Sequence, residues 1–194
     1  LKAEQDIPDV RRRNVIGLAR RCQAPESHSL HVANLALSLF DQTKREHHLG
    51  HQERTWLEYA AILHDAGYLI NPRQHHKHAY YLIKHSDLGG LTAEDIDVVA
   101  TVARYHRRSV PALKHEEFNR LTPRLQRVVK ILASLLRIAD GLDRTHFSLA
   151  QAVHVRLGKQ ITIDVQLTGD AEMELWAAKS RADLFEQVFR RRVQ

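Results

Sequence analysis

The chain has 194 residues, with 29 Lys and Arg against 23 Asp and Glu, a formal net charge of +6 and 14 histidines. Because 43% of the residues are hydrophobic and 27% are charged, the composition excludes a wholly disordered chain. The single cysteine excludes an intramolecular disulfide framework and a cysteine-rich zinc site. No apolar run approaches the ~18 residues of a membrane span, so we expect a cytoplasmic protein without a membrane partner.

Apolar residues at helical spacing predict six helices before residue 150. Few helix breakers interrupt this part, since the whole chain has only 8 glycines and 5 prolines. Asp9, Thr92 and Thr122 are expected to be N-caps, and Pro123 suits a first helical turn. The expected helices cover residues 9–22, 27–47, 52–65, 72–85, 92–107 and about twenty residues from 122.

The pattern changes after residue 150. Residues 152–157 and 160–167 alternate with period two, and Gly158 and Lys159 between them predict a hairpin turn. A last helix is expected from about 171 to 190. The sequence therefore predicts a mainly α protein, with a helical domain over residues 1–150 and a small α+β subdomain over 151–194.

Histidine and aspartate recur on the apolar stripes of these helices. Residues that share a stripe with apolar neighbours are His28, His31, His64, His75, His78, His85, His106 and Asp140. An unpaired buried carboxylate costs several kcal/mol, and metal coordination is one way of stabilising it. Imidazole and carboxylate together favour Zn, Fe, Mn, Co or Ni over Ca. The alternative is that each histidine is hydrogen-bonded in the core and each aspartate caps a turn.

The adjacent pair His64 and Asp65 carries the first resemblance. With His31 before it and Asp140 after it, the order resembles the H…HD…D motif of the HD superfamily of metal-dependent phosphohydrolases. The resemblance implies an HD-type helical bundle in which these four residues bind one divalent ion. The ion would be Mn, Fe, Mg, Co, Ni or Zn.

A second ion is also implied by this resemblance. HD families that bind two ions place further histidines between the HD pair and the last aspartate. His78 and His106 occupy such positions, and Asp65 would then bridge the two ions. The number of ions, one or two, stays open.

A longer series of segments resembles the C-terminal region of the exopolyphosphatase and guanosine pentaphosphate phosphohydrolase (Ppx/GppA) family. The segments are 64–71, 75–83, 86–90, 104–108 and 136–144, followed in the tail by 174–178 and 184–189. Together they extend over nearly the whole chain. The resemblance implies hydrolysis of a phosphoanhydride or phosphoester in polyphosphate, a guanosine polyphosphate or a nucleotide.

The sequence lacks one part of the family pattern. Members with exopolyphosphatase activity carry N-terminal actin-like domains with glycine-rich phosphate loops and a catalytic Glu, and no segment here resembles those domains. Two interpretations remain open. The chain is a metal-dependent phosphohydrolase, or it is a non-catalytic module of a larger exopolyphosphatase that binds polyphosphate or a nucleotide and serves regulation or dimerisation.

Basic residues cluster near the predicted ligands. The arginines that we expect to bind the phosphate groups of a substrate are Arg104, Arg107, Arg108, Arg137 and Arg144. The alternative is that they solvate helix ends and pair with nearby carboxylates. In metal-assisted hydrolysis, Asp65 would be catalytic as an ion ligand, and His75 or Lys77 could protonate the leaving group.

The positive charge predicts an anionic partner, and a phosphate-containing substrate meets this expectation. A nucleic acid is a weaker candidate. No helix-turn-helix and no interleaving of aromatic and basic residues is present, and Phe, Trp and Tyr make up only 6% of the chain. A homodimer is compatible with the second interpretation.

Overall fold

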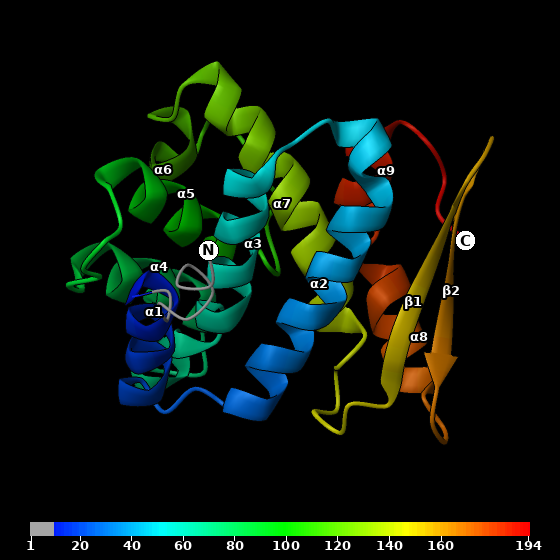
Figure 1. The fold of residues 1–194 in the computed structure, drawn as a ribbon, viewed down its shortest axis with the longest axis horizontal. Helices are drawn as coiled ribbons and strands as arrows, with labels where there is room; N and C mark the ends of the chain where they lie inside the picture. The colour runs from blue at the N-terminus through cyan, green and yellow to red at the C-terminus, as the bar shows by residue number, and fades with distance from the viewer. Residues whose placement is uncertain (1–9) are drawn as a thin grey trace, which may run out of the picture.

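Three helices form the centre of the fold in the computed structural model, which describes residues 10–194. They are α2 (Glu26–His47), α3 (His51–Leu63) and α7 (Pro123–Gly141), and they pack against one another (Figure 1). Each buries a stripe of aliphatic side chains that includes Leu39, Leu57 or Leu132. The predicted mainly α fold is confirmed.

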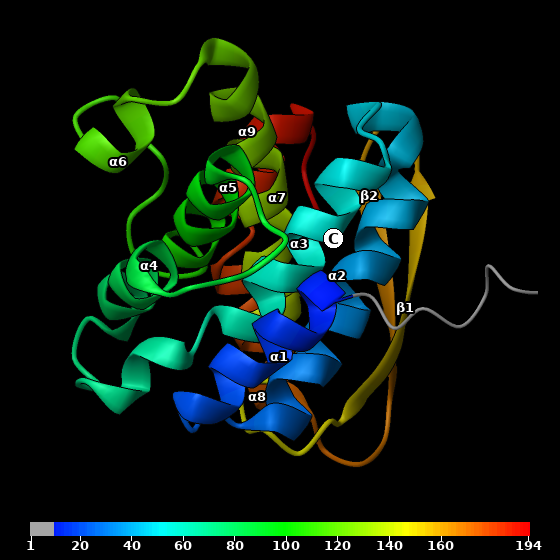
Figure 2. The ribbon, with the colours of Figure 1, turned by 60° about the vertical axis from the view of Figure 1, so that its left-hand side comes forward.

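The remaining helices of the bundle pack around this centre. They are α1 (Val10–Arg21), α4 (His75–His85), α5 (Ala93–Arg104) and two single turns, η1 (Ala66–Leu69) and α6 (Glu116–Asn119). Helices α4 and α5 lie side by side, and α5 also contacts α3 and α7 (Figure 2). All six expected helices are present, although α3 ends two residues earlier, α4 begins three residues later and α5 ends three residues earlier than predicted. The expected cap Asp9 lies outside the described residues.

Two threonine caps determine where α5 and α7 begin. Thr92 Oγ1 accepts a hydrogen bond from the Asp95 amide at 3.2 Å, and the Asp95 carboxylate accepts one from the Thr92 amide at 2.8 Å. Thr122 Oγ1 accepts from the Leu125 amide at 3.4 Å, and Pro123 opens the first turn of α7. These caps fix the starting points of the two helices whose far ends reach the site described below.

The hairpin is formed by β1 (Ala150–Leu157) and β2 (Ile161–Leu167), which pair antiparallel as predicted. Strand β1 packs against α2. The side-chain amide of Gln42 donates to the Val153 carbonyl and accepts from the Val155 amide, both at 2.8 Å. The outer edge of β1 is therefore partly occupied by a side chain of the bundle.

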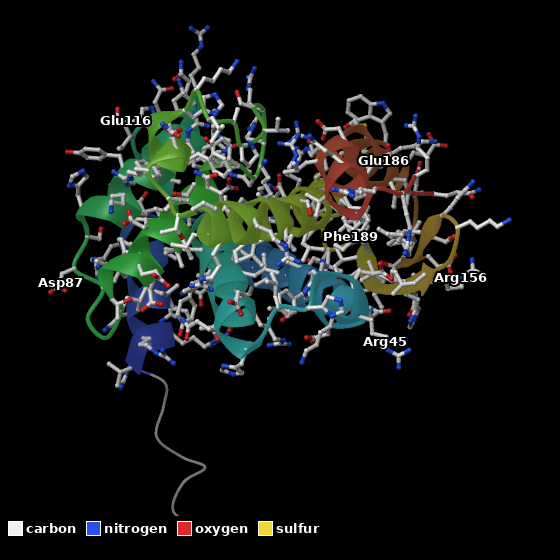
Figure 3. All side chains as sticks on the ribbon, turned by 90° about the horizontal axis from the view of Figure 1, so that it is seen from above. Arg45, Asp87, Glu116, Arg156, Glu186 and Phe189 are labelled. Carbon is white, nitrogen blue, oxygen red and sulfur yellow. The ribbon has the colours of Figure 1, made fainter. Side chains whose placement is uncertain are left out.

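The C-terminal residues cover part of the other edge of the hairpin. The Ile161 amide donates to the Arg192 carbonyl, and the Gln194 amide donates to the Ile161 carbonyl, each at 2.9 Å. In Figure 3 the hairpin residue Arg156 lies at one end of the molecule, and Asp87 and Glu116 lie at the other. Among residues 10–194, no helix is long and apolar enough to cross a membrane.

The last helix was predicted to be continuous over 171–190, and this is wrong. The segment forms α8 (Glu172–Ser180) and α9 (Asp183–Phe189), which both pack on α7 (Figure 1). The break lets α9 bury Leu184 and Phe185, and Arg181 at the break pairs with a carboxylate of α7. The division of the chain into domains at residue 150 stays a prediction.

Candidate metal centre

Two groups of buried histidine and aspartate side chains lie next to each other and share Asp65. One group contains His28, His64 and Asp65, and the other contains Asp65, His75 and His106. Within each group, one nitrogen or oxygen from every residue lies within 4.8 Å of the others. The residues come from the start of α2, the end of α3, the start of α4 and the end of α5. Segments far apart in the sequence therefore converge on one carboxylate.

The Asp65 carboxylate faces both groups. Its Oδ2 lies 3.6 Å from His28 Nε2. Its Oδ1 lies 3.6 Å from His64 Nε2, 3.3 Å from His75 Nε2 and 3.9 Å from His106 Nε2. Asp65 is therefore the residue that the two groups have in common.

Asp140 adds a second carboxylate to the first group. Its Oδ1 lies 3.6 Å from His28 Nε2 and 3.5 Å from His64 Nε2. Its Oδ2 pairs with a guanidinium nitrogen of Arg181. Asp140 thus lies near the end of α7 as predicted, and it comes together with His64 and Asp65.

Backbone carbonyls fix the orientation of three of the histidines. In each case Nδ1 donates to the carbonyl three residues earlier: His64 to Ala61 at 2.7 Å, His75 to Pro72 at 3.1 Å and His106 to Ala103 at 2.7 Å. A carbonyl can only accept, so the proton of the neutral ring lies on Nδ1. In the neutral form of these rings, each Nε2 therefore carries the lone pair that a metal ligand needs.

His28 is oriented by a carboxylate instead. Its Nδ1 lies 2.7 Å from Asp143 Oδ2, and Asp143 is fully buried. The other oxygen of Asp143 accepts from the Ser148 amide at 2.8 Å. Pairing of a ligand histidine with a buried carboxylate is common around metal ions, where it sets the tautomer and raises the basicity of the ring.

The residues present fit a divalent cation. His28 Nε2 and His64 Nε2 are buried and have no hydrogen-bond partner among residues 10–194. Buried polar atoms of this kind are rare because leaving them unsatisfied is costly. Imidazole nitrogens and carboxylate oxygens are the donors that transition-metal ions prefer. A cation between these atoms would satisfy all of them at once.

The charges of the centre stabilise one another. Burial would lower the pKa of His28, but the nearby carboxylates of Asp140 and Asp143 outweigh burial and raise that pKa to about 9. Burial raises the pKa of Asp140, yet the neighbouring imidazoles of His28 and His64 and the charge of Arg181 hold it well below its usual value. For Asp65, the charge of His64 likewise outweighs burial and lowers the pKa. Both carboxylates are therefore ionised at neutral pH.

Two exposed rings flank the centre. His146 stacks on His28 with ring centroids 3.6 Å apart, and Tyr68 stacks on His75 with centroids 4.0 Å apart. Burial and the charge of Asp65 raise the pKa of the Tyr68 hydroxyl. The two rings mark the side on which the centre approaches the protein surface.

The structure does not bring His31 into the centre. Its Nε2 lies 2.9 Å from the Ala150 carbonyl, because this side of α2 faces β1. His28, three residues earlier on the same predicted stripe, occupies the position expected for His31. His31 instead binds a strand carbonyl.

The structure does not bring His78 into the centre either. It is half-buried and belongs to neither group, because α4 turns His75, Ala79 and Ile83 inwards. His75 is a candidate ligand in place of His78, although we expected His75 to donate a proton to the leaving group. The other residue expected to donate a proton, Lys77, is exposed on α4.

The five arginines expected to bind phosphate occupy different environments. Arg107 Nη1 lies 3.4 Å from His75 Nε2, at the edge of the second group. Arg108 and Arg144 are exposed. Arg144 follows the end of α7, so it shares no helical face with Asp140.

The other two of these arginines are buried and paired within the protein. Arg104 Nε lies 3.3 Å from Glu117 Oε1. Arg137 Nη2 lies 3.3 Å from Asp183 Oδ1, and its Nη1 donates to the Tyr105 carbonyl at 3.4 Å. Burial lowers the pKa of Arg137. These contacts match the alternative interpretation, in which arginines pair with local acceptors.

Sequence reasoning missed Asp143, His146, Tyr68 and Arg181 as site residues. Asp143 had a usable signal, since it follows Asp140 by three residues and so falls one turn further along. Arg181 had none, because it lies in a segment that reads as the interior of a helix.

Comparison with known proteins identifies the family. The profile of the Ppx/GppA phosphatase, domain III, matches residues 10–182. The chain belongs to this family. A guanosine-5'-triphosphate,3'-diphosphate pyrophosphatase of Photobacterium profundum is 30% identical over 146 residues, which cover 74% of this chain and 29% of the relative. The chain thus spans less than a third of the length of that Ppx/GppA-type protein, and the resemblance to the C-terminal region of the family is confirmed.

Proposed function

We propose that this Ppx/GppA domain III is an HD-type, metal-dependent phosphohydrolase centre. The observation that carries the proposal is the convergence of His28, His64, His75 and His106, each through Nε2, on the Asp65 carboxylate. A buried cluster of this composition, with ring nitrogens that lack partners, supports a cation site over a set of hydrogen-bonded core histidines.

Each residue has a definite task in this proposal. Asp65 links the two groups, Asp140 completes the first, and Asp143 orients His28. When bound, one or two divalent ions of the Mn, Fe, Mg, Co, Ni or Zn type would supply Lewis acidity and lower the pKa of a water ligand. Arg107, beside His75, is placed to hold a phosphate oxygen by charge-assisted hydrogen bonds.

The proposed substrate is a phosphate-containing anion. Hydrolysis would break a phosphoanhydride or phosphoester bond in polyphosphate, a guanosine polyphosphate or a nucleotide. The name of the Photobacterium relative, a pyrophosphatase, favours the phosphoanhydride. The chain has 29 basic and 23 acidic side chains, and this net positive charge supports attraction of such an anion.

A second candidate is a non-catalytic module that binds polyphosphate or a nucleotide. The observation that favours it is the match to domain III together with coverage of only 29% of the relative. In this case the centre would hold phosphate groups, and hydrolysis would take place in N-terminal actin-like domains of a larger protein. The module could also contribute dimer contacts.

An experiment with the purified chain separates these candidates. Bound metal is measured by elemental analysis, and phosphate release is followed with polyphosphate, guanosine polyphosphate and nucleotides after reconstitution with Mn²⁺. The test variant carries His64→Ala with Asp65→Ala. The control carries His85→Ala with Asp87→Ala, which removes an exposed histidine and an exposed aspartate.

The possible results distinguish the enzyme, the binding module and a wrong assignment of the centre. Chelator-sensitive hydrolysis by the wild type and the control, absent from the test variant, supports the enzyme. Metal and anion binding without hydrolysis supports the module. Equal metal content in the wild type and the test variant would show that the centre is wrongly assigned.

A further inference from the structure

The two oxygens of the Asp140 carboxylate have different partners. Oδ1 faces His28 Nε2 at 3.6 Å and His64 Nε2 at 3.5 Å, whereas Oδ2 pairs with Arg181. The Asp140 and Arg181 side chains are only 12% and 17% exposed. A full positive charge from the C-terminal helices therefore lies on a candidate metal ligand.

Close packing of α8 on α7 places Arg181 there. A Cβ atom on Gly141 would lie 2.6 Å from Ala178 Cα and 2.7 Å from the Ala178 nitrogen, so only glycine allows this approach. Gly141 directly follows Asp140, and Arg181 lies one helical turn after Ala178. The contact between the two backbones thus fixes the guanidinium beside the carboxylate.

Further polar contacts hold the same helices in place. Glu174 Oε1 on α8 accepts from the Thr145 amide at 3.1 Å and from the Thr145 hydroxyl. Asp183 on α9 pairs with Arg137 of α7 at 3.3 Å. Arg181 is therefore part of a fixed interface with α7.

The two carboxylates of the centre, Asp65 and Asp140, differ in the kind of cation with which they pair. Among residues 10–194, the ion pairs of Asp65 are all with histidines, namely His28, His64, His75 and His106. Asp140 is paired with a guanidinium, which keeps its charge at any pH of interest. A guanidinium therefore pairs directly with a carboxylate at the first group, whereas Arg107 at the edge of the second group lies against His75.

We propose that Arg181 is the built-in counter-ion of Asp140, and that its charge and the charge of a divalent ion substitute for each other at this carboxylate. The inference rests on the metal centre proposed above. Arg181 is a positioning residue: it stabilises the ion-free chain, because a buried carboxylate without a partner is costly. It also weakens binding of the ion at the first group, because two positive charges repel each other strongly when they lie close together and are partly shielded from water.

The test compares three variants of the full chain with the wild type, with Mn²⁺ as the probe. Arg181→Gln removes the charge, Arg181→Lys keeps it, and Lys179→Gln removes an exposed charge on the same helix. Isothermal titration gives the Mn²⁺ affinity. Thermal unfolding is measured in chelator and in saturating Mn²⁺.

We expect Arg181→Gln to bind one Mn²⁺ on the order of tenfold more tightly than the wild type. Its Tm in chelator should fall by roughly 5 °C, and the difference from the wild type should shrink in Mn²⁺. Arg181→Lys and Lys179→Gln should bind Mn²⁺ as the wild type does. A residue with a merely structural role would lower the Tm equally in both conditions and would not tighten binding.

Equal or weaker Mn²⁺ binding by Arg181→Gln overturns the inference but leaves the metal centre intact. Absence of saturable Mn²⁺ binding by the wild type overturns the centre and the inference with it. If Arg181→Gln folds neither in chelator nor in saturating Mn²⁺, the Mn²⁺ affinity of Arg181→Lys tests the inference instead. Unchanged Mn²⁺ affinity in that variant supports the charge effect, and changed affinity contradicts it.

Discussion

Near their starts, helices α2 and α4 each carry a pair of histidines three residues apart, and in each pair only the first histidine reaches the candidate metal centre. His28 and His75 turn Nε2 towards Asp65, at 3.6 and 3.3 Å. His31 binds a strand carbonyl, and His78 lies outside both groups. Identical spacing on the two helices therefore gives one candidate ligand and one histidine outside the centre each time.

The difference shows what helical spacing can and cannot specify. Residues three apart share a face but differ in direction by about 60°, which is wide compared with a cluster a few ångströms across. The contacts of each helix select the residue that points inwards. On α2 the neighbour is β1, which occupies His31. On α4 it is the turn η1, which contacts the start of the helix at Gly67.

The largest expected effect comes from disturbing that contact. A Cβ atom on Gly67 would lie 1.9 Å from the His75 carbonyl oxygen and 2.5 Å from the Ala79 nitrogen. Because both neighbours are backbone atoms, Gly67→Ala must move α4. We expect a loss of more than about 3 kcal/mol in the free energy of unfolding, measured in urea, together with loss of the His75 group.

Gly17→Ala is the matched control for this substitution. Gly17 lies within α1, and its nearest neighbour is a flexible Arg21 side-chain atom at 3.7 Å. Alanine there should increase stability by roughly 0.5–1 kcal/mol. Equal stability of the two variants would show that Gly67 does not position α4.

The second effect compares His28→Ala with His31→Ala. Loss of His28 leaves Asp143, which is fully buried, without its histidine partner, so we expect a cost of about 2–4 kcal/mol and loss of one bound metal ion. Loss of His31 removes one hydrogen bond to Ala150, which is worth about 1 kcal/mol, and should leave the metal content unchanged. Elemental analysis measures the metal content of the two variants, and urea unfolding measures their stability. Metal loss in His31→Ala would restore the assignment expected from the sequence.

The third effect is the pH dependence of the free energy of unfolding of the metal-free chain. His28 has its pKa raised from 6.5 to about 9, so the stabilisation from this pairing is fully present below pH 6.5 and is lost as the pH rises through 9. Between pH 6.5 and 8.5, the stability difference between the wild type and His28→Ala should shrink by about 2 kcal/mol. A difference that stays constant with pH would mean that His28 is not charged between Asp140 and Asp143.

Several parts of the centre could be predicted from the sequence. His64 and Asp65 are adjacent at a helix end, so their mutual position hardly depends on tertiary contacts. His106 and Asp140 lie at the ends of two strongly apolar helices whose caps could be predicted.

The remaining parts depend on contacts that local sequence does not encode. The choice of His28 over His31 is set by a hydrogen bond to β1, more than a hundred residues away. The role of Arg181 depends on a helix break that contains neither glycine nor proline, and on the approach of Gly141 to Ala178. Such features follow from packing, so a pattern of helix formers and apolar residues does not reveal them.

The smallest effect on stability is expected for the second pair, His75→Ala and His78→Ala. His75 Nδ1 is bound to the Pro72 carbonyl, and its Nε2 lies 3.3 Å from Asp65, which keeps three other histidines. Loss of His75 should therefore cost about 1–2 kcal/mol, close to the effect of His78→Ala at its half-buried position. The two variants should differ in metal binding instead. His75→Ala should lose the ion of the second group and keep that of the first, because His28, His64 and Asp140 are untouched, whereas His78→Ala should keep both. Titration with Mn²⁺ counts the ions, and retention of full stoichiometry by His75→Ala would reduce the centre to a single ion at the first group.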